Sequence, residues 1–295
     1  MYCELLYNTP INKEIFRLDF IWQGTTPKAG QFFMVRPKRS SVFLGRPLSM
    51  ENWMHASKNW SYIQKEVRSI KDPFERYLKE KYLESNTVRF MVARRGKGTL
   101  ELAAMQSGEE AEIIGPLGNS WSDFLPKKRK SDKLVALVGG GIGIAPLYAL
   151  LCEKPEYGFV FHAGFKKGFK NIDEKTALLG AAYLGAESII VASETGKTSF
   201  TAHDGGEAAP GLKGRIPDFL EPEKYSAVCA CGPEAMLKAV AEKCTAANVP
   251  CYVSMERHMA CGVGACLGCT VTTTKGSRRC CADGPIFPAS EIIWL

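Results

Sequence analysis

The chain has 295 residues, of which 45% are hydrophobic and 23% charged, with a formal net charge of +7. This length exceeds the usual size of one domain, and the composition is ordinary for a globular protein. The positive residues are scattered, with their longest run at 127–130 (KKRK), and no nucleic-acid-reading motif accompanies them. We therefore expect no nucleic-acid partner.

Residues 1–125 contain short segments in which polar and apolar residues alternate, such as 14–22 (EIFRLDFIW) and 87–95 (TVRFMVARR). Glycine and proline turns separate these segments. The pattern predicts an antiparallel β-barrel or sandwich.

Residues 51–86 interrupt this pattern. Asp72 and Pro73 predict the N-cap and first residue of a helix, whose one face carries Phe74, Tyr77, Leu78 and Tyr82. Two interpretations stay open: a helix laid against the barrel, or a docking surface for a partner.

Residues 131–250 alternate apolar runs with helical patterns, including 173–184 (DEKTALLGAAYL). Repeated strand–helix units predict a parallel sheet with crossover helices. Residues 134–152 lack charge and are long enough to cross a bilayer. Four glycines and Pro146 interrupt them, however, so we expect a strand, a turn and a helix, and no membrane span.

Two glycine turns in this region each follow an apolar strand and precede a helix. The first is 139–143 (GGGIG) and the second is 231–233 (CGP). Such turns offer N–H groups to a pyrophosphate, and at the carboxyl ends of parallel strands they would flank one crevice. The third glycine of the dinucleotide fingerprint is replaced by Ile144. Glu194 is a candidate acceptor for a ribose hydroxyl, or a solvated loop residue.

The tail is rich in cysteine. Cys261, Cys266 and Cys269 have the C-x4-C-x2-C spacing of plant-type [2Fe–2S] ligands, with glycines that let the backbone curl around a cluster. Structural zinc and unligated cysteines are the alternatives. Cys280 and Cys281 compete for a fourth position, because adjacent side chains of an extended segment point to opposite faces.

Two short motifs in the first region offer candidate groups for binding a phosphate. Arg46 supplies a charge for a phosphate and Ser49 a hydroxyl, while Gly98 and Thr99 offer a backbone and hydroxyl cradle. Each motif alone is equally a surface turn. Because a nucleotide domain and an iron–sulfur tail follow these motifs along the chain, however, the whole has the domain order of a flavin reductase.

These motifs together resemble the ferredoxin-reductase-like flavoprotein superfamily. The tail, with 259–269 (MACGVGACLGC) and 281–287 (CADGPIF), is similar to that of the electron-transfer subunits of NAD-linked (class 1B) dihydroorotate dehydrogenase. The resemblance implies a β-barrel FAD domain over 1–125 with an inserted helical segment 51–86. It also implies a Rossmann-like α/β NAD domain over 131–250 and a small [2Fe–2S] domain over 251–295.

The resemblance also implies the residues of each site. FAD would contact Arg46, Pro47, Leu48, Ser49, Met91, Val92, Ala93, Gly98 and Thr99. NAD would contact Gly141, Gly143, Cys231, Gly232 and Pro233. The cluster would be held by Cys261, Cys266, Cys269 and the cysteine before x-D-G-P, which is Cys281.

The activity implied is electron transfer in pyrimidine biosynthesis. Electrons from dihydroorotate, oxidised at FMN in a catalytic partner subunit, would pass through [2Fe–2S] and FAD to NAD⁺. The resemblance further implies a heterotetramer and no side-chain acid, base or nucleophile. Eleven cysteines in a chain with no recognisable secretion signal favour a reducing compartment, so we expect the cytoplasm. Alternatives are a subunit linking NAD(P)H to ferredoxin or sulfur reduction, and a zinc-bearing interaction module. The segment 51–86 and the long loop 198–212 depart from the family, and Ser199, His203 and Asp204 resemble a catalytic triad only by composition.

Overall fold

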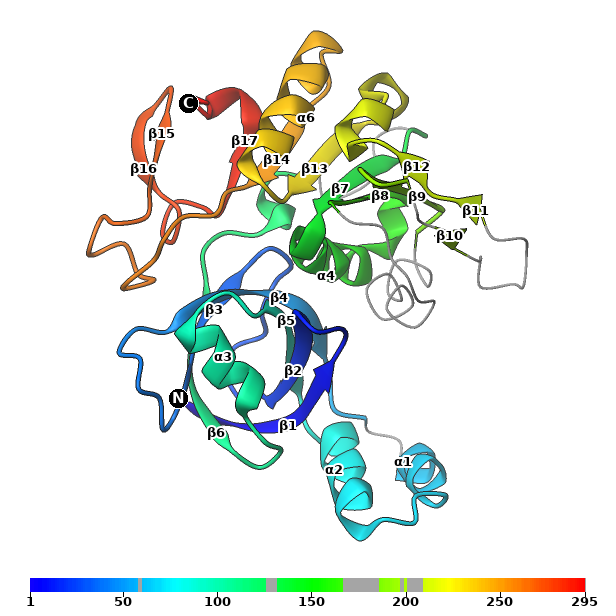
Figure 1. The fold of residues 1–295 in the computed structure, drawn as a ribbon, viewed down its shortest axis with the longest axis vertical. Coiled ribbons are helices and arrows are strands. Elements are labelled where there is room, and N and C mark those ends of the chain that lie inside the picture. The colour runs from blue at the N-terminus through cyan, green and yellow to red at the C-terminus, as the bar shows by residue number, and fades with distance from the viewer. Residues whose placement is uncertain (58–59, 126–131, 167–185, 197–198, 201–208, 295) are drawn as a thin grey trace. The chain divides into compact units, whose positions relative to one another are not determined.

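A computed structural model describes residues 1–57, 60–125, 132–166, 186–196, 199–200 and 209–294 (Figure 1). The chain divides into two compact units. Unit 1 comprises Met1–Pro27 and Phe32–Pro116, and unit 2 comprises Lys28–Gln31 and Leu117–Leu295. The expected helix at 173–184, the basic run 127–130, His203, Asp204 and most of the loop 198–212 lie outside the described residues.

Unit 1 contains a closed barrel with strand order β1-β2-β5-β4-β3-β6. Neighbouring strands pair antiparallel, as β2 does with β5 and β4 does with β5, so the predicted barrel is confirmed. The strands are β1 (Tyr2–Pro10), β2 (Ile15–Ile21), β3 (Phe32–Pro37), β4 (Arg46–Met54), β5 (Thr87–Ala93) and β6 (Glu110–Leu117).

Aromatic side chains fill the barrel, because alternate residues of each strand point inward. The Phe33 ring lies 5.1 Å from that of Trp22 and 5.3 Å from that of Phe90, each edge to face. Phe16 and Phe20 of β2 are also buried. Burial of this apolar surface is the main driving force that holds the strands around one core.

The inserted segment forms two helices between β4 and β5, α1 (Trp60–Val67) and α2 (Pro73–Glu84). Asp72 is the N-cap of α2 and accepts a hydrogen bond from the Glu75 N–H at 2.7 Å. Pro73 occupies the first helical position, so the predicted helix start is confirmed.

The expected apolar face of α2 is divided between the barrel and solvent. Leu78 is buried, and the Tyr82 ring meets that of Tyr7 on β1 edge to face at 5.4 Å. Phe74 and Tyr77 remain 56% and 49% exposed. The helix therefore lies against the barrel through only part of the predicted face.

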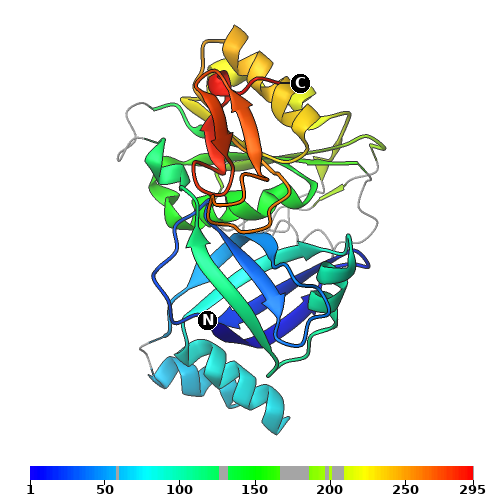
Figure 2. The same ribbon diagram turned by 90° about the vertical axis from the view of Figure 1, so that its left-hand side faces the viewer.

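Unit 2 is built on a seven-stranded sheet with strand order β12-β9-β8-β7-β13-β14-β17. The pairs up to β14 are parallel, whereas β17 runs antiparallel to β14. Helices α4 (Ala145–Glu153) and α6 (Glu234–Ala246) cover opposite faces (Figures 1 and 2). The strands are β7 (Val135–Gly140), β8 (Phe159–Phe165), β9 (Ser188–Ser193), β12 (Leu212–Lys213), β13 (Ala227–Cys231), β14 (Cys251–Ser254) and β17 (Ile286–Pro288). The predicted parallel sheet is confirmed.

The cysteine-rich tail is attached to the edge of this sheet through β14 and β17. Between them lies a hairpin of β15 (Thr270–Thr273) and β16 (Gly276–Arg279), which is drawn beside the sheet in Figure 1 and in front of it in Figure 2. A second small ribbon pairs β10 (Ser199–Phe200) with β11 (Ala209–Pro210). Within the described residues, no helix is both long and apolar enough to cross a membrane.

Candidate cofactor sites

The two motifs that are expected to bind flavin meet at the start of a helix in unit 1. Arg46 opens β4, and Gly98 lies in the first turn of α3 (Lys97–Ala104). A Cβ on Gly98 would overlap Nε of Arg46, so glycine is required for this approach. That Nε is buried and makes no hydrogen bond with the described residues. An unpartnered cationic donor beside a helix N-terminus fits a phosphate group.

Thr99 shapes the same helix start. Its hydroxyl accepts from the N–H groups of Arg95 and Gly96 at 2.9 and 3.1 Å, and donates to the Gly96 carbonyl at 2.9 Å. The Thr99 hydroxyl is therefore already hydrogen-bonded to the main chain that immediately precedes its own helix. The N–H groups in the first turn of a helix have no partner within that helix, and they remain the natural donors to an anion.

The three candidates on β5 point in two directions. Val92 shares the face of Phe90, whose ring packs against Phe33 inside the barrel, so only the main chain of Val92 faces outward. Met91 and Ala93 lie on the outer face, where Met91 is opposite Arg17 of β2. Pro47, Leu48 and Ser49 pair with Met34, Phe33 and Phe32 of β3.

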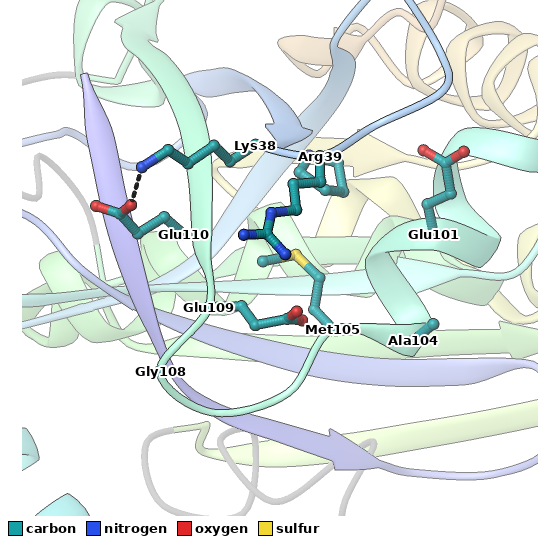
Figure 3. Close-up of a pocket in the computed structure, with 9 residues that line it drawn as sticks. Lys38, Arg39, Glu101, Ala104, Met105, Gly108, Glu109 and Glu110 are labelled. Carbon is teal, nitrogen blue, oxygen red and sulfur yellow. Dashed lines mark hydrogen bonds and ion pairs between the residues drawn. The ribbon is translucent and has the colours of Figure 1, made fainter.

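A cavity of about 500 Å³ in unit 1 is lined by Ala104, the last residue of α3, and by Met105 after it (Figure 3). Lys38 and Glu110 form an ion pair on one of its walls, and Arg39 projects into it. Glu101, on its wall, accepts from the hydroxyls of Ser40 and Ser41, and these bonds lower the pKa of its carboxyl. None of the residues expected to hold FAD lines this cavity.

The two glycine turns of unit 2 pack against each other. β7 and β13 are parallel neighbours in which Gly139 is opposite Cys231. A Cβ on Gly143 would overlap the Cys231 carbonyl, and one on Gly140 would lie 2.8 Å from Cδ of Pro233. Residues 139–143 and 231–233 therefore form one continuous surface at the carboxyl ends of two strands, where nucleotides bind in such sheets.

Gly141 supplies the open side of that surface. Its φ of +57° lies in the left-handed region, and a Cβ there would meet nothing within 4 Å. Glu194, the candidate ribose acceptor, follows β9 and is exposed. Its role stays a prediction.

The four tail cysteines fall into two pairs. Sγ of Cys269 lies 3.2 Å from Sγ of Cys281. Sγ of Cys261 accepts from the Cys266 N–H at 3.5 Å and is also hydrogen-bonded to the Cys266 side chain. The Gly264 N–H donates to Sγ of Cys281 at 3.1 Å and so links the two pairs. Two thiolates for each iron is the donor set of a [2Fe–2S] cluster.

The two pairs differ in their surroundings. Cys266 is exposed and Cys261 half-buried, whereas Cys269 and Cys281 are buried. The N–H groups of Cys266 and Val263 lower the pKa of Cys261 to about 6. Burial, reinforced by Cys269, raises the pKa of Cys281 to about 12. No three His, Cys, Asp or Glu side chains in the described part of the chain are grouped to hold a single ion.

Cys280 points away from these cysteines. Its buried thiol donates to the Met255 carbonyl at 2.8 Å, and burial raises its pKa to about 12. Its main-chain N–H donates to the Cys269 carbonyl at 2.9 Å. The structure thus places Cys281, and not Cys280, beside Cys269. His258 is exposed.

The tail matches a family model described as the iron-sulfur cluster binding domain of dihydroorotate dehydrogenase B, over residues 256–293. The electron transfer subunit of dihydroorotate dehydrogenase B (NAD(+)) from Clostridium perfringens is 36% identical over 268 residues, covering 90% of this chain and 86% of that one. Its counterpart from Caldanaerobacter subterraneus is 33% identical over 300 residues, covering 100% and 98%. The chain belongs to this family.

Solved structures agree on the fold. An NADH-dependent reduced ferredoxin-NADP oxidoreductase, studied for flavin-based electron bifurcation, has a TM-score of 0.70 at 23% identity, covering 99% of this chain and 90% of that one. A ferredoxin NADP+ reductase from Neisseria gonorrhoeae with bound FAD and NADP has a TM-score of 0.56 at 16% identity, covering 88% and 94%.

Family membership makes the chain an electron-transfer subunit of an oxidoreductase that works with a catalytic partner subunit. The three cofactors expected from the sequence, FAD, an iron–sulfur cluster and NAD, fit this family and this fold.

Proposed function

We propose that this subunit carries electrons from dihydroorotate oxidation to NAD⁺ on the residues singled out above. The cluster is assigned to Cys261, Cys266, Cys269 and Cys281, and the observation that carries the proposal is their arrangement as two linked thiol pairs. NAD is assigned to Gly141, Gly143, Cys231, Gly232 and Pro233. FAD is assigned to Arg46, Pro47, Leu48, Ser49, Met91, Ala93, Gly98, Thr99 and the main chain of Val92.

When bound, the cluster supplies single-electron exchange and FAD converts between single electrons and the hydride carried by NAD. The chain's own residues bind and orient. Arg46 offers its unpartnered guanidinium N–H to a phosphate of FAD, and Gly98 leaves the space for that side chain. The glycine turns let a pyrophosphate approach the main chain of β7 and β13 closely. No side chain is assigned a proton-transfer or nucleophilic role.

The partner is proposed to be an FMN-containing catalytic subunit, in a heterotetramer. The exposed Cys261–Cys266 side of the cluster loop is the side open to another chain. Beside it, Val263 and Leu267 are 58% and 63% exposed, and Leu267 has a φ of +59°. Apolar side chains that a strained loop holds in solvent favour contact with a partner, because the contact would remove their apolar surface from water.

The cytoplasm is the proposed location. The structure pairs none of the eleven cysteines in a disulfide; four are assigned to a cluster and the other seven are free thiols. Free thiols in this number persist in a reducing compartment.

The experiment that tests the proposal is a visible absorption spectrum of the purified protein before and after anaerobic addition of NADH. Flavin bands overlaid by a broad iron–sulfur shoulder, both bleached by NADH, are expected. A colourless protein that contains zinc and does not react with NADH would instead support the interaction module.

A further inference from the structure

The segment that leads from the sheet into the cysteine loop passes directly beside the second glycine turn. Ser254, the last residue of β14, is the parallel partner of Cys231 at the end of β13. Three residues later, Arg257 forms a bidentate ion pair with Glu234. Its Nη1 lies 3.0 Å from Oε2, and its Nη2 lies 3.2 Å from Oε1. The tail thus contributes a cation to the edge of the nucleotide surface.

Glu234 occupies a position where a negative charge is costly for nucleotide binding. It is the first residue of α6 and follows Pro233 of the turn. A carboxylate at a helix N-terminus is favourable in the free protein, but it repels a pyrophosphate bound to the same turn. Pairing with Arg257 cancels that charge locally.

The guanidinium of Arg257 also retains donors for a ligand. Its three hydrogen bonds go to the two oxygens of Glu234 and, at 2.8 Å, to the Glu256 carbonyl. They use three of the five N–H groups of an arginine. The remaining two, on Nη2 and Nε, make no hydrogen bond within the described part of the chain. Its side chain is 26% exposed, so these donors are accessible at a partly desolvated site.

We propose that Arg257, from the cluster-bearing tail, is a nucleotide-binding residue. It neutralises Glu234 and donates its two remaining N–H groups to the pyrophosphate of NAD. The inference rests on the proposed NAD site at residues 139–143 and 231–233, and extends that site to a segment previously assigned only to the cluster. Because the pair is bidentate, lysine is not an equivalent replacement.

The test is calorimetric titration of the holoprotein, loaded with flavin and iron, with NAD⁺ and with ADP-ribose, which has the pyrophosphate but no redox chemistry. Arg257→Ala should weaken both ligands at least about tenfold, as expected for a lost charge-assisted contact. Arg257→Lys should give an intermediate loss. Glu234→Gln added to Arg257→Ala should recover part of the affinity, because the uncompensated carboxylate is then gone.

The matched control is Lys275→Ala, which removes another ion-paired cation of the tail, the partner of Glu291 at 2.6 Å. It should leave nucleotide affinity unchanged. In steady-state NADH oxidation with ferricyanide, Arg257→Ala should raise KM and leave kcat within about twofold.

The outcomes separate this inference from the proposed function. If the wild-type holoprotein binds neither NAD⁺ nor ADP-ribose, the proposed NAD site itself fails. If the wild type binds both, and Arg257→Ala and Arg257→Lys keep flavin, iron and wild-type affinity within twofold, the role of Arg257 is refuted while the site stands.

Discussion

The barrel and the cysteine tail assemble their candidate sites in opposite ways. In the barrel, Arg46 and Gly98 are far apart in the sequence, and strand register brings them into contact. In the tail, Cys261 to Cys281 come from one continuous stretch that curls on itself through Gly262 and Gly264, with φ of +71° and +84°. Spacing along the chain therefore describes the tail site, whereas the barrel site exists only once the sheet has formed.

This difference predicts that the two sites fail independently. Loss of a tail thiol should remove the cluster without disturbing the barrel, and a small change in the barrel should release flavin without affecting iron. The largest expected effect concerns the buried thiol pair.

Cys269→Ser should abolish the cluster, because serine replaces a buried thiolate paired with Cys281 at 3.2 Å. Iron content should fall to background while flavin is retained. Cys280→Ser is the matched control, since its hydroxyl preserves the bond to the Met255 carbonyl and it should keep its iron. Iron loss in the control equal to that in Cys269→Ser would contradict the ligand assignment.

Gly98→Ala should weaken FAD binding by about 3 kcal/mol, more than a hundredfold, because the new methyl displaces Arg46 and removes charge-assisted bonds to a phosphate. Alanine is otherwise the better helix residue, so a loss of overall stability is not the expected cause. Flavin content and fluorescence titration measure the effect, and unchanged iron content is the internal control. Wild-type FAD affinity in this variant would mean that Arg46 does not contact FAD.

The two units also bury titratable groups differently. Asp19 in the barrel is paired with Arg89 at 2.7 Å, whereas His162 in the sheet is hydrogen-bonded, among the described residues, only to the Tyr225 hydroxyl at 2.9 Å. Burial lowers the pKa of His162 from 6.5 to about 4. Between these values the unfolded chain binds the proton and the folded sheet does not, so stability is present above pH 6.5 and falls as the pH approaches 4.

The loss amounts to about 3 kcal/mol. Hydrogen exchange of β8 amides measures it locally. When the pH falls from 6.5 to 4, the free energy of unfolding of His162→Leu should decrease by about 3 kcal/mol less than that of the wild type, whatever the variant's absolute stability. Identical slopes in the two proteins would refute this assignment.

The smallest expected effect concerns the exposed side of the cluster loop. Leu267→Asp should weaken association with the catalytic partner about tenfold, because a charge replaces an apolar contact. Phe74→Asp on α2 is the matched control, with a comparable exposed fraction of 56%. Light scattering of the mixed subunits measures the assembly. If only the control dissociates, the inserted helices and not the cluster loop contact the partner.

The sequence predicts local features best. The cysteine spacing, the helix start at Asp72 and Pro73, and the barrel and parallel-sheet patterns all depend on near neighbours, and the structure contains the corresponding elements. The inward direction of the Val92 side chain is also predictable from the sequence, because Val92 and Phe90 are two residues apart on one strand and therefore share a face.

Contacts that depend on strand register could not be predicted from the sequence. The pairing of Arg257 with Glu234 requires β13 and β14 to be parallel neighbours. The addition of β17 to the sheet was missed because Ile286–Pro288 is too short for a clear alternation. The split face of α2 likewise depends on where Tyr7 lies on β1.

The cysteine tail is proposed to hold a two-iron cluster on two thiol pairs. The most direct test of this proposal is electron paramagnetic resonance of the reduced full-length protein, with iron and zinc measured on the same sample. The reduced protein should show one half-integer spin signal for every two irons and contain no stoichiometric zinc. One zinc per chain, with no such signal, would contradict the proposal.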